Sequence, residues 1–183
     1  MAISMDQLKR LLDNEGLRYF LDPRRDAVML SGGGMFGVYQ CVILLEMNGT
    51  FLQFRSLAYA HCTQQHPQLA AVLRLLAEVN YLKRMFKIGW DADDGEITAY
   101  LDVWIEDNTL TQAQFGQVLR LYFSVLDSTN RRLRQVLETG KDPGELGAED
   151  IMRILREQGI PAPPGGGGGA GPRRPSGDDL SRI

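Results

Sequence analysis

The alternation of apolar and polar residues over the first sixty positions predicts one helix followed by four short strands. Ser4 and Gln7 form a capping-box pattern at the start of the helix, and Gly16 is expected to end it. The strands are expected at 17–21, 27–30, 35–47 and 50–57. Asn48-Gly49 is a strong hairpin signal between the last two strands. The first sixty residues therefore predict a helix followed by antiparallel strands.

The second half predicts two further helices around a hairpin. Apolar residues keep helical spacing from Pro67 to about Lys83. Strands at 85–90 and 96–106 follow, joined by the turn 91–95. Thr111 and Gln114 form a second capping box, which opens a helix of roughly 26 residues. The element order is α-β-β-β-β-α-β-β-α, so we expect an α+β fold in which helices cover one face of an antiparallel sheet.

One expected strand carries a candidate binding face. Between 96 and 106 the inward positions are apolar, and the outward set is Glu96, Thr98, Tyr100, Asp102, Trp104 and Glu106. Large amphipathic aromatic residues of this kind are enriched at protein interfaces. We therefore predict that Tyr100, Asp102 and Trp104 bind a partner or a second subunit. The competing interpretation is that a helix or the tail of the same chain covers this face.

Composition and charge narrow the classes of function. The 183 residues carry a net charge of −3, which disfavours nucleic-acid binding by overall positive charge. Cys41 and Cys62 are too few for a disulfide framework, which favours a reduced, cytoplasmic environment. The stretch 27–45 contains no charged residue, but glycines at its centre favour two strands over a membrane span.

The composition also divides the chain. Residues 160–183 hold seven Gly and five Pro among 24 residues, so we predict a disordered tail. The α+β domain is expected at 1–139. Residues 140–159 are expected to form a linker with a short amphipathic helix at 148–158.

The segment from Ala77 to Leu119 supports a family assignment. Its sequence is AEVNYLKRMFKIGWDADDGEITAYLDVWIEDNTLTQAQFGQVL. This segment resembles the YbjN family, whose members look like type III secretion chaperones in fold, and a weaker resemblance extends back to about residue 3. The resemblance implies binding of a polypeptide partner, often as a homodimer, in a chaperone-like or regulatory role. It supplies no catalytic residue that could be transferred to a position in this chain.

Four other patterns have both a chemical and a structural interpretation. Gly32–Gly37 satisfies GxGxxG, but a β-branched run follows it, so a glycine-rich hairpin is favoured over a nucleotide loop. Asp91–Gly95 is favoured as a turn over a calcium loop. His61, Cys62 and His66 are favoured as loop residues over zinc ligands. The cations Arg131, Arg132 and Arg134 are explained by the dipole of the long helix, with an anionic-partner patch as the alternative.

These observations favour a noncatalytic protein-binding module over an enzyme. We expect it to bind a polypeptide partner, or a second copy as a homodimer, through the sheet face and helix grooves. It is expected to need no metal or cofactor and to bind neither nucleic acid nor membrane. The alternative is an enzyme that binds a small ligand or nucleotide through the Gly32–Gly37 loop.

Overall fold

The computed structural model describes residues 3–22, 24–105, 109–157 and 159. The chain forms two compact units, Met1–Glu145 and Leu146–Ile183. The strands of the first unit are β1 (Tyr19–Asp22), β2 (Ala27–Gly33), β3 (Val38–Glu46), β4 (Phe51–Leu57), β5 (Ala60–His61), β6 (Phe86–Trp90) and β7 (Glu96–Trp104). Its helices are α1 (Met5–Asn14), α2 (Leu69–Leu82) and α3 (Gln112–Thr139), with a 3₁₀ turn at Met47–Gly49.

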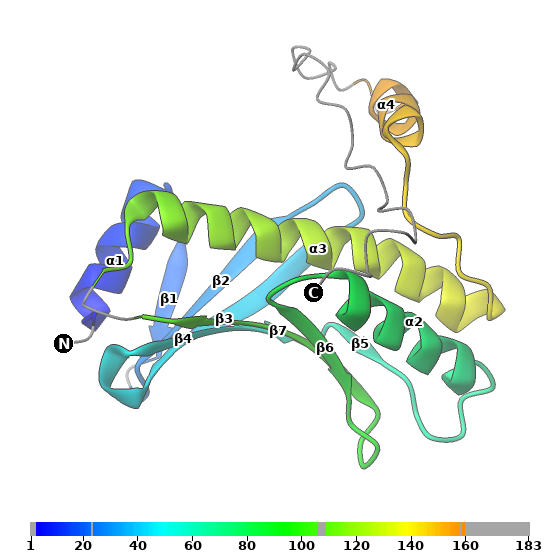
Figure 1. The fold of residues 1–183 in the computed structure, drawn as a ribbon, viewed down its shortest axis with the longest axis horizontal. Helices are drawn as coiled ribbons and strands as arrows, with labels where there is room; N and C mark the ends of the chain where they lie inside the picture. Colours follow the sequence, from blue (N-terminus) through cyan, green and yellow to red (C-terminus); the bar gives the residue numbers. More distant parts are fainter. Residues whose placement is uncertain (1–2, 23, 106–108, 158, 160–183) are drawn as a thin grey trace, which may run out of the picture. The chain divides into compact units, whose positions relative to one another are not determined.

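The strands form one antiparallel sheet, in which β1, β2, β3, β4 and β7 lie in that order. One edge of β7 pairs with β4 and β5, and β6 pairs with the other edge (Figure 1). Arg55 of β4 pairs with Tyr100, and Ala60 of β5 pairs with Ile97, so five residues of one side span only three residues of β7. Two extra residues are therefore inserted between β4 and β5, where Ala58 adopts a positive φ of 47°.

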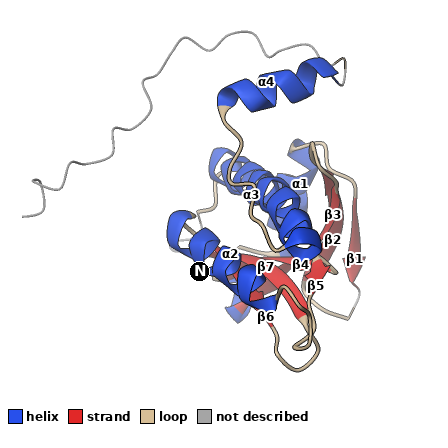
Figure 2. Ribbon diagram, turned by 90° about the vertical axis from the view of Figure 1, so that its right-hand side faces the viewer, coloured by secondary structure: helices blue, strands red, loops and turns tan. Residues whose placement is uncertain are grey.

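The helices of this unit lie on one face of the sheet. In Figure 1, α3 runs across the strands from α1 to α2, and the opposite face carries none of the three helices. The view turned by 90° in Figure 2 shows the same separation of helices from strands. The predicted fold class, an α+β fold with an antiparallel sheet, is confirmed.

Capping boxes begin α1 and α3 where they were expected. The side-chain oxygens of Ser4 and Thr111 accept hydrogen bonds from the backbone N–H groups of Gln7 and Gln114, which completes both capping boxes. Gly140 ends α3 in the left-handed conformation, with φ of 72°. These caps satisfy backbone groups at the helix ends that have no partner within the helix.

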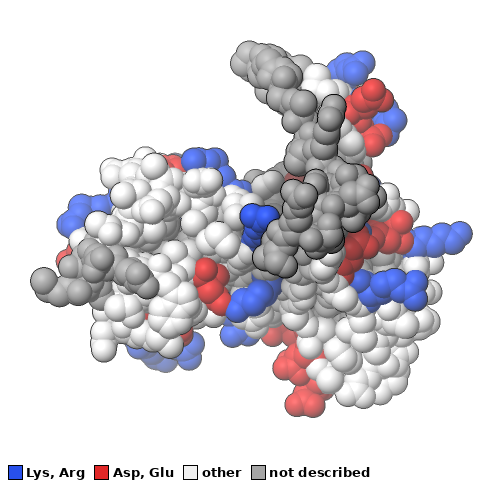
Figure 3. All heavy atoms as spheres, in the orientation of Figure 1, with Lys and Arg blue, Asp and Glu red and all other residues white. Residues whose placement is uncertain are grey.

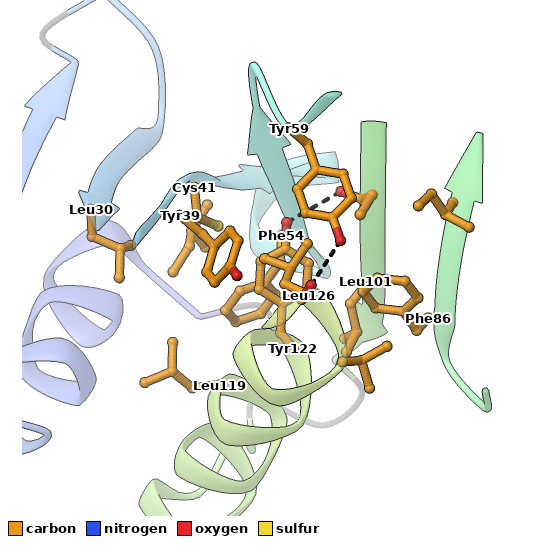
Figure 4. Close-up of a cluster of buried hydrophobic side chains, with 14 of the residues drawn as sticks. Leu30, Tyr39, Cys41, Phe54, Tyr59, Phe86, Leu101, Leu119, Tyr122 and Leu126 are labelled. Carbon is orange, nitrogen blue, oxygen red and sulfur yellow. Dashed lines mark hydrogen bonds between the residues drawn. The ribbon is translucent and has the colours of Figure 1, made fainter. Parts of the chain in front are cut away.

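The core lies between α3 and the sheet and contains a buried cluster of aromatic residues (Figure 4). Tyr122 of α3 packs against Phe54 of β4 and Phe86 of β6. Its hydroxyl donates to the carbonyl of Ala99 at 3.2 Å. Because a buried hydroxyl without a partner is costly, this bond lets a tyrosine occupy the centre of the core.

Besides shifts of one to three residues at the ends of elements, the structure differs from the expected elements in two places. The two-residue strand β5 was not predicted, and it carries too few residues to show an alternating pattern. Asn48-Gly49, expected to form a tight hairpin turn, lies in a 3₁₀ turn where Met47, Asn48 and Gly49 all have positive φ. Glu106 and the predicted disordered tail at 160–183 lie outside the described residues.

The second unit contains α4 (Ala148–Glu157). This helix was expected at 148–158. None of its described residues is buried. Asp150 and Arg153 form an ion pair at 2.7 Å along its surface.

Candidate binding face

The face of the sheet opposite α1, α2 and α3, here called the outer face, presents side chains in rows that cross the strands. Residues paired across antiparallel strands project from the same face. The longest row joins Phe20, Met29, Val42, Arg55, Tyr100 and Lys87. The predicted site residues Tyr100, Asp102 and Trp104 lie on this same face, as their alternation along β7 required.

Tyr100 lies between two basic residues on the outer face, Arg55 of β4 and Lys87 of β6. The guanidinium carbon of Arg55 lies 5.6 Å from the centroid of the Tyr100 ring, within the range of a cation–π contact. Arg55 also forms an ion pair with Glu96 at 3.7 Å. The ring of Tyr100 is therefore half-buried beneath a cation instead of lying free on the surface.

Asp102 is tied to the strands on both sides of β7. Its carboxylate accepts a hydrogen bond from Gln53 Nε2 of β4 at 3.0 Å. It also forms an ion pair with Lys87 of β6. Asp102 therefore holds neighbouring polar side chains in place on the outer face.

Trp104 is the exposed member of the predicted set. Its side chain remains 64% accessible, although its ring contacts Phe51 with centroids 4.9 Å apart. Thr98 is the one outward-facing residue of β7 whose side chain is buried. The described helices therefore leave Trp104 uncovered, and the tail, the other segment expected to cover it, lies outside the described residues.

Two adjoining hollows lie on the outer face over β1 to β4. They measure about 390 and 200 Å³ and share Met29 and Leu57. Phe20, at the rim of the larger hollow, is 77% exposed. The arginines Arg18, Arg25 and Arg55 line one or the other hollow. Asp22 also lines the smaller hollow, so an apolar floor is surrounded by three arginines and one acid.

Sequence patterns did not identify the residues of these hollows. Ala27–Leu30 is a continuous apolar run, and such a run does not show by its periodicity which side chains face the core. Only the pairing of Phe20 with Met29, and of Met29 with Val42, places them on the outer face.

Charged side chains of both signs are mixed on the side of the molecule that Figure 3 shows. In the view of Figure 3, basic and acidic side chains are interspersed and separated by wide uncharged areas. This distribution agrees with the net charge of −3. None of the described helices is both long enough and apolar enough to cross a membrane.

The Gly32–Gly37 loop forms the predicted hairpin. The strand β3 follows it directly, and Gly34 N–H donates to the carbonyl of Gly37 at 2.8 Å. The backbone N–H groups of Met35 and Phe36 donate to the carboxylate of Asp127 on α3, at 2.7 and 2.9 Å. Amide groups that would hold a phosphate in a nucleotide loop are therefore occupied by a carboxylate of the same chain.

The other candidate chemical groups have structural partners. His61 Nε2 lies 2.7 Å from the carbonyl of Asp94, and His66 Nδ1 accepts from the Gln68 N–H at 3.2 Å. Burial raises the pKa of the Cys62 thiol, and it raises that of Cys41 to about 12. Such thiols are poor nucleophiles and poor metal ligands in their protonated form. Within the described ranges, no three metal-ligating side chains gather at one place.

The turn at 91–95 is likewise held by its own groups. Asp91 accepts from the Asp93 N–H and Asp94 from the Glu96 N–H, each at 2.8 Å. Gly95 adopts a φ of 80°, which a glycine allows without strain. These bonds account for the aspartates as turn residues.

The helix-dipole interpretation of the arginine cluster was wrong for Arg132. Arg132 is 2% exposed and lies between acids of two segments, α2 and 142–145. Its guanidinium bonds to Glu78 of α2 at 2.8 Å and to Asp142, and it lies 4.0 Å from Glu145. Arg132 therefore fastens 142–145 to the helices, and this segment belongs to the first compact unit.

Comparison with known proteins identifies the family. The model of the YbjN family, described as "Putative bacterial sensory transduction regulator", matches residues 4–135. Among curated proteins, none matches the chain. The crystal structure of YbjN from E. coli is similar, with a TM-score of 0.56 and 18% identity, over 75% of this chain and 95% of that one. This similarity shows a shared fold.

Two further structural neighbours come from protein complexes. A chain of the ExsC–ExsE complex matches with a TM-score of 0.47 and 16% identity, over 73% of this chain and 97% of that one. A chain of the HopA1–SchA chaperone–effector complex matches with a TM-score of 0.49 and 12% identity, over 70% and 98%. Both scores lie below 0.5, so neither similarity carries an argument about this chain. The family model, in contrast, covers most of the sequence, and the chain therefore belongs to the YbjN family.

Proposed function

We propose that this chain is a noncatalytic protein-binding module, with a chaperone-like or regulatory role, that receives a polypeptide partner on the outer face of its sheet. The observation that carries the proposal is the exposure of large apolar side chains there. Phe20 and Trp104 stand at opposite ends of a face that no helix of the same unit covers. Exposed apolar patches of this kind generally mark a contact surface.

The chemistry of the outer face supports one kind of partner. The apolar floor at Met29, Val42 and Leu57 suits apolar side chains. Neither Arg18 nor Arg25 forms an ion pair with a described residue. Acidic residues beside the apolar anchors would complement these cations. The expected partner is thus a polypeptide segment with apolar anchors flanked by Asp or Glu.

A second copy of the chain is the competing occupant of the same face. A homodimer would bury Trp104 against its counterpart or against the hollows, and the mixed charges of the face would permit it. Sedimentation velocity over a concentration series separates the two occupants, because only a homodimer shows an intrinsic, concentration-dependent association.

Trp104→Ala tests the proposal in both cases. An interface aromatic often contributes about 2 kcal/mol, so association should weaken by about thirtyfold while the thermal unfolding transition is kept. The matched control is Tyr81→Ala, because Tyr81 is 89% exposed on α2, in the helical layer. Association is measured by sedimentation, and by capture of partners identified by mass spectrometry.

The two variants give opposite expectations. Tyr81→Ala should leave self-association and captured partners unchanged. If the wild type is monomeric and Trp104→Ala captures the same proteins with the same yield, the outer face does not bind the partner and the proposal fails.

A further inference from the structure

A cavity opens where strands β3 and β4 separate. Gln40 and Leu57 form the last residue pair between the two strands. Beyond it the chain turns at Ala58, whose φ of 47° is unusual for a residue other than glycine. The following strand β5 pairs with β7 instead of β3. No described strand therefore pairs with the start of β3 on this side.

Helix α3 closes the space between the separated strands. Asn130 and Arg134, one helical turn apart, line the cavity together with Tyr39, Ala58 and Tyr59. The cavity measures about 300 Å³. Small-molecule pockets range from about 300 to 1,000 Å³, so this cavity suits a group of amino-acid size and is too small for a dinucleotide.

Two polar groups of the cavity lack partners among the residues that the structure describes. Asn130 is only 5% exposed, and its Oδ1 is buried without a hydrogen bond. A buried unpaired carbonyl oxygen is costly, and the amide can turn about χ2 to meet a donor in the cavity. Arg134 is exposed and forms no ion pair with any described residue. The cavity thus offers a hydrogen-bond acceptor and a cation.

The tyrosines supply aromatic walls. Their ring centroids lie 6.2 Å apart, and both residues are labelled in Figure 4. The hydroxyl of Tyr39 donates to Asp127 at 2.6 Å, and that of Tyr59 donates to the carbonyl of Leu126 at 2.7 Å. Because both hydroxyl protons are already committed, the rings contribute carbon surface and not donors.

We propose that this cavity binds a carboxylate that carries an adjacent amide N–H and an apolar side chain. The guanidinium of Arg134 pairs with the carboxylate, since its planar donors match two carboxylate oxygens. The Asn130 carbonyl accepts from the N–H, and the apolar side chain contacts the tyrosine rings. This chemistry occurs in an N-acylated apolar amino acid and in the last residue of a polypeptide.

The test uses the full chain and isothermal titration calorimetry. The probes are N-acetyl-leucine, an acetylated pentapeptide ending in leucine, and the same pentapeptide with an amidated C-terminus. Binding of either acid with a Kd below about 1 mM is expected. The amidated peptide should bind at least about tenfold more weakly, because it lacks the charge that pairs with Arg134.

Two further comparisons distinguish a small acid from a polypeptide C-terminus and test the role of Arg134. Binding of N-acetyl-leucine assigns a small acid, and binding of the peptide acid alone assigns a polypeptide C-terminus. Arg134→Gln should weaken binding by at least about tenfold, whereas Arg74→Gln, the same change at an exposed position of α2, should not.

Three outcomes would overturn the assignment. They are no binding of either acid at millimolar concentration, equal binding of the amidated peptide, and undiminished binding by Arg134→Gln. Each variant is first checked for an unchanged thermal unfolding transition, and Arg134→Lys serves if Arg134→Gln does not fold. The outer face is untouched by these variants, so failure here leaves the Trp104 experiment unaffected.

Discussion

The side-chain amide of Asn80 pairs with both backbone groups of Ile88, as a neighbouring strand would. Asn80 Oδ1 accepts from the Ile88 N–H at 2.8 Å, and Nδ2 donates to the Ile88 carbonyl at 2.9 Å. Ile88 lies on β6, which pairs only with β7 among the described strands. The end of α2 therefore occupies the middle of an edge that would otherwise be open to another chain.

Asn80→Ala is expected to lower the free energy of unfolding by about 1–3 kcal/mol, because two backbone groups of the buried Ile88 lose their partners. Urea denaturation measures the change. Asn14→Ala, which removes an exposed contact to Gln112, is the control and should cost less. Equal losses in the two variants would contradict the role of Asn80 as an edge cap.

The glycines of the β2–β3 hairpin are expected to differ in their tolerance of alanine. An added Cβ at Gly34 would lie 2.3 Å from the Asp127 side chain, and one at Gly37 would lie 3.0 Å from the Tyr39 hydroxyl. At Gly33 nothing lies within 4 Å. Gly34→Ala should therefore destabilise most, by about 1–3 kcal/mol, and Gly33→Ala least. Thermal unfolding of the three variants measures this order.

The same variants test the nucleotide alternative. Because Asp127 occupies the loop amides, neither the wild type nor Gly34→Ala should bind an adenine or nicotinamide nucleotide at micromolar concentration. Micromolar binding by the wild type that is lost in Gly34→Ala would restore the enzyme hypothesis.

Asp142 should make the stability of the fold depend on pH. Its hydrogen bond and ion pair with Arg132 hold the pKa of the carboxyl below its ordinary value of 3.8. A carboxyl with a lowered folded-state pKa stabilises the fold above its unfolded pKa and loses that contribution as pH falls through the folded value. Asp142→Asn should therefore lower the melting temperature at pH 6, and the deficit should shrink as pH falls below 3.8.

The control for the pH dependence is Asp6→Asn, since Asp6 is highly exposed and forms a surface ion pair with Lys9. Its melting temperature should follow the wild type at every pH. A deficit of Asp142→Asn that is the same at pH 6 and at pH 3 would show that the loss is steric and unrelated to charge.

Local patterns predicted the elements because their signals lie close together in the sequence. Each capping box needs two residues three positions apart, and both formed as expected. The alternation along β7 similarly placed Tyr100, Asp102 and Trp104 on one face. What the pattern could not show was their environment, since Arg55 and Phe51 reach them from another strand.

The rest depends on contacts between distant residues. Arg132 looked like a surface cation at the end of a long helix, and only the position of Glu78, 54 residues away, shows that it is buried. No sequence pattern indicated a role for Asp127, because its partners Met35 and Phe36 lie about 90 residues earlier in the chain. The cavity beside Asn130 likewise needs the separation of β3 from β4, which Ala58 gives no reason to expect.

The occupied hairpin loop implies that a small anion should be able to replace a missing side chain. Asp127→Gly would leave two backbone amides and the Tyr39 hydroxyl around a vacancy of carboxylate size. Free acetate or formate should then restore thermal stability to this variant in a saturable manner, while leaving the wild type unchanged. Such rescue would show that the hairpin loop is an anion-binding site, which the Asp127 carboxylate of the same chain occupies in the wild type.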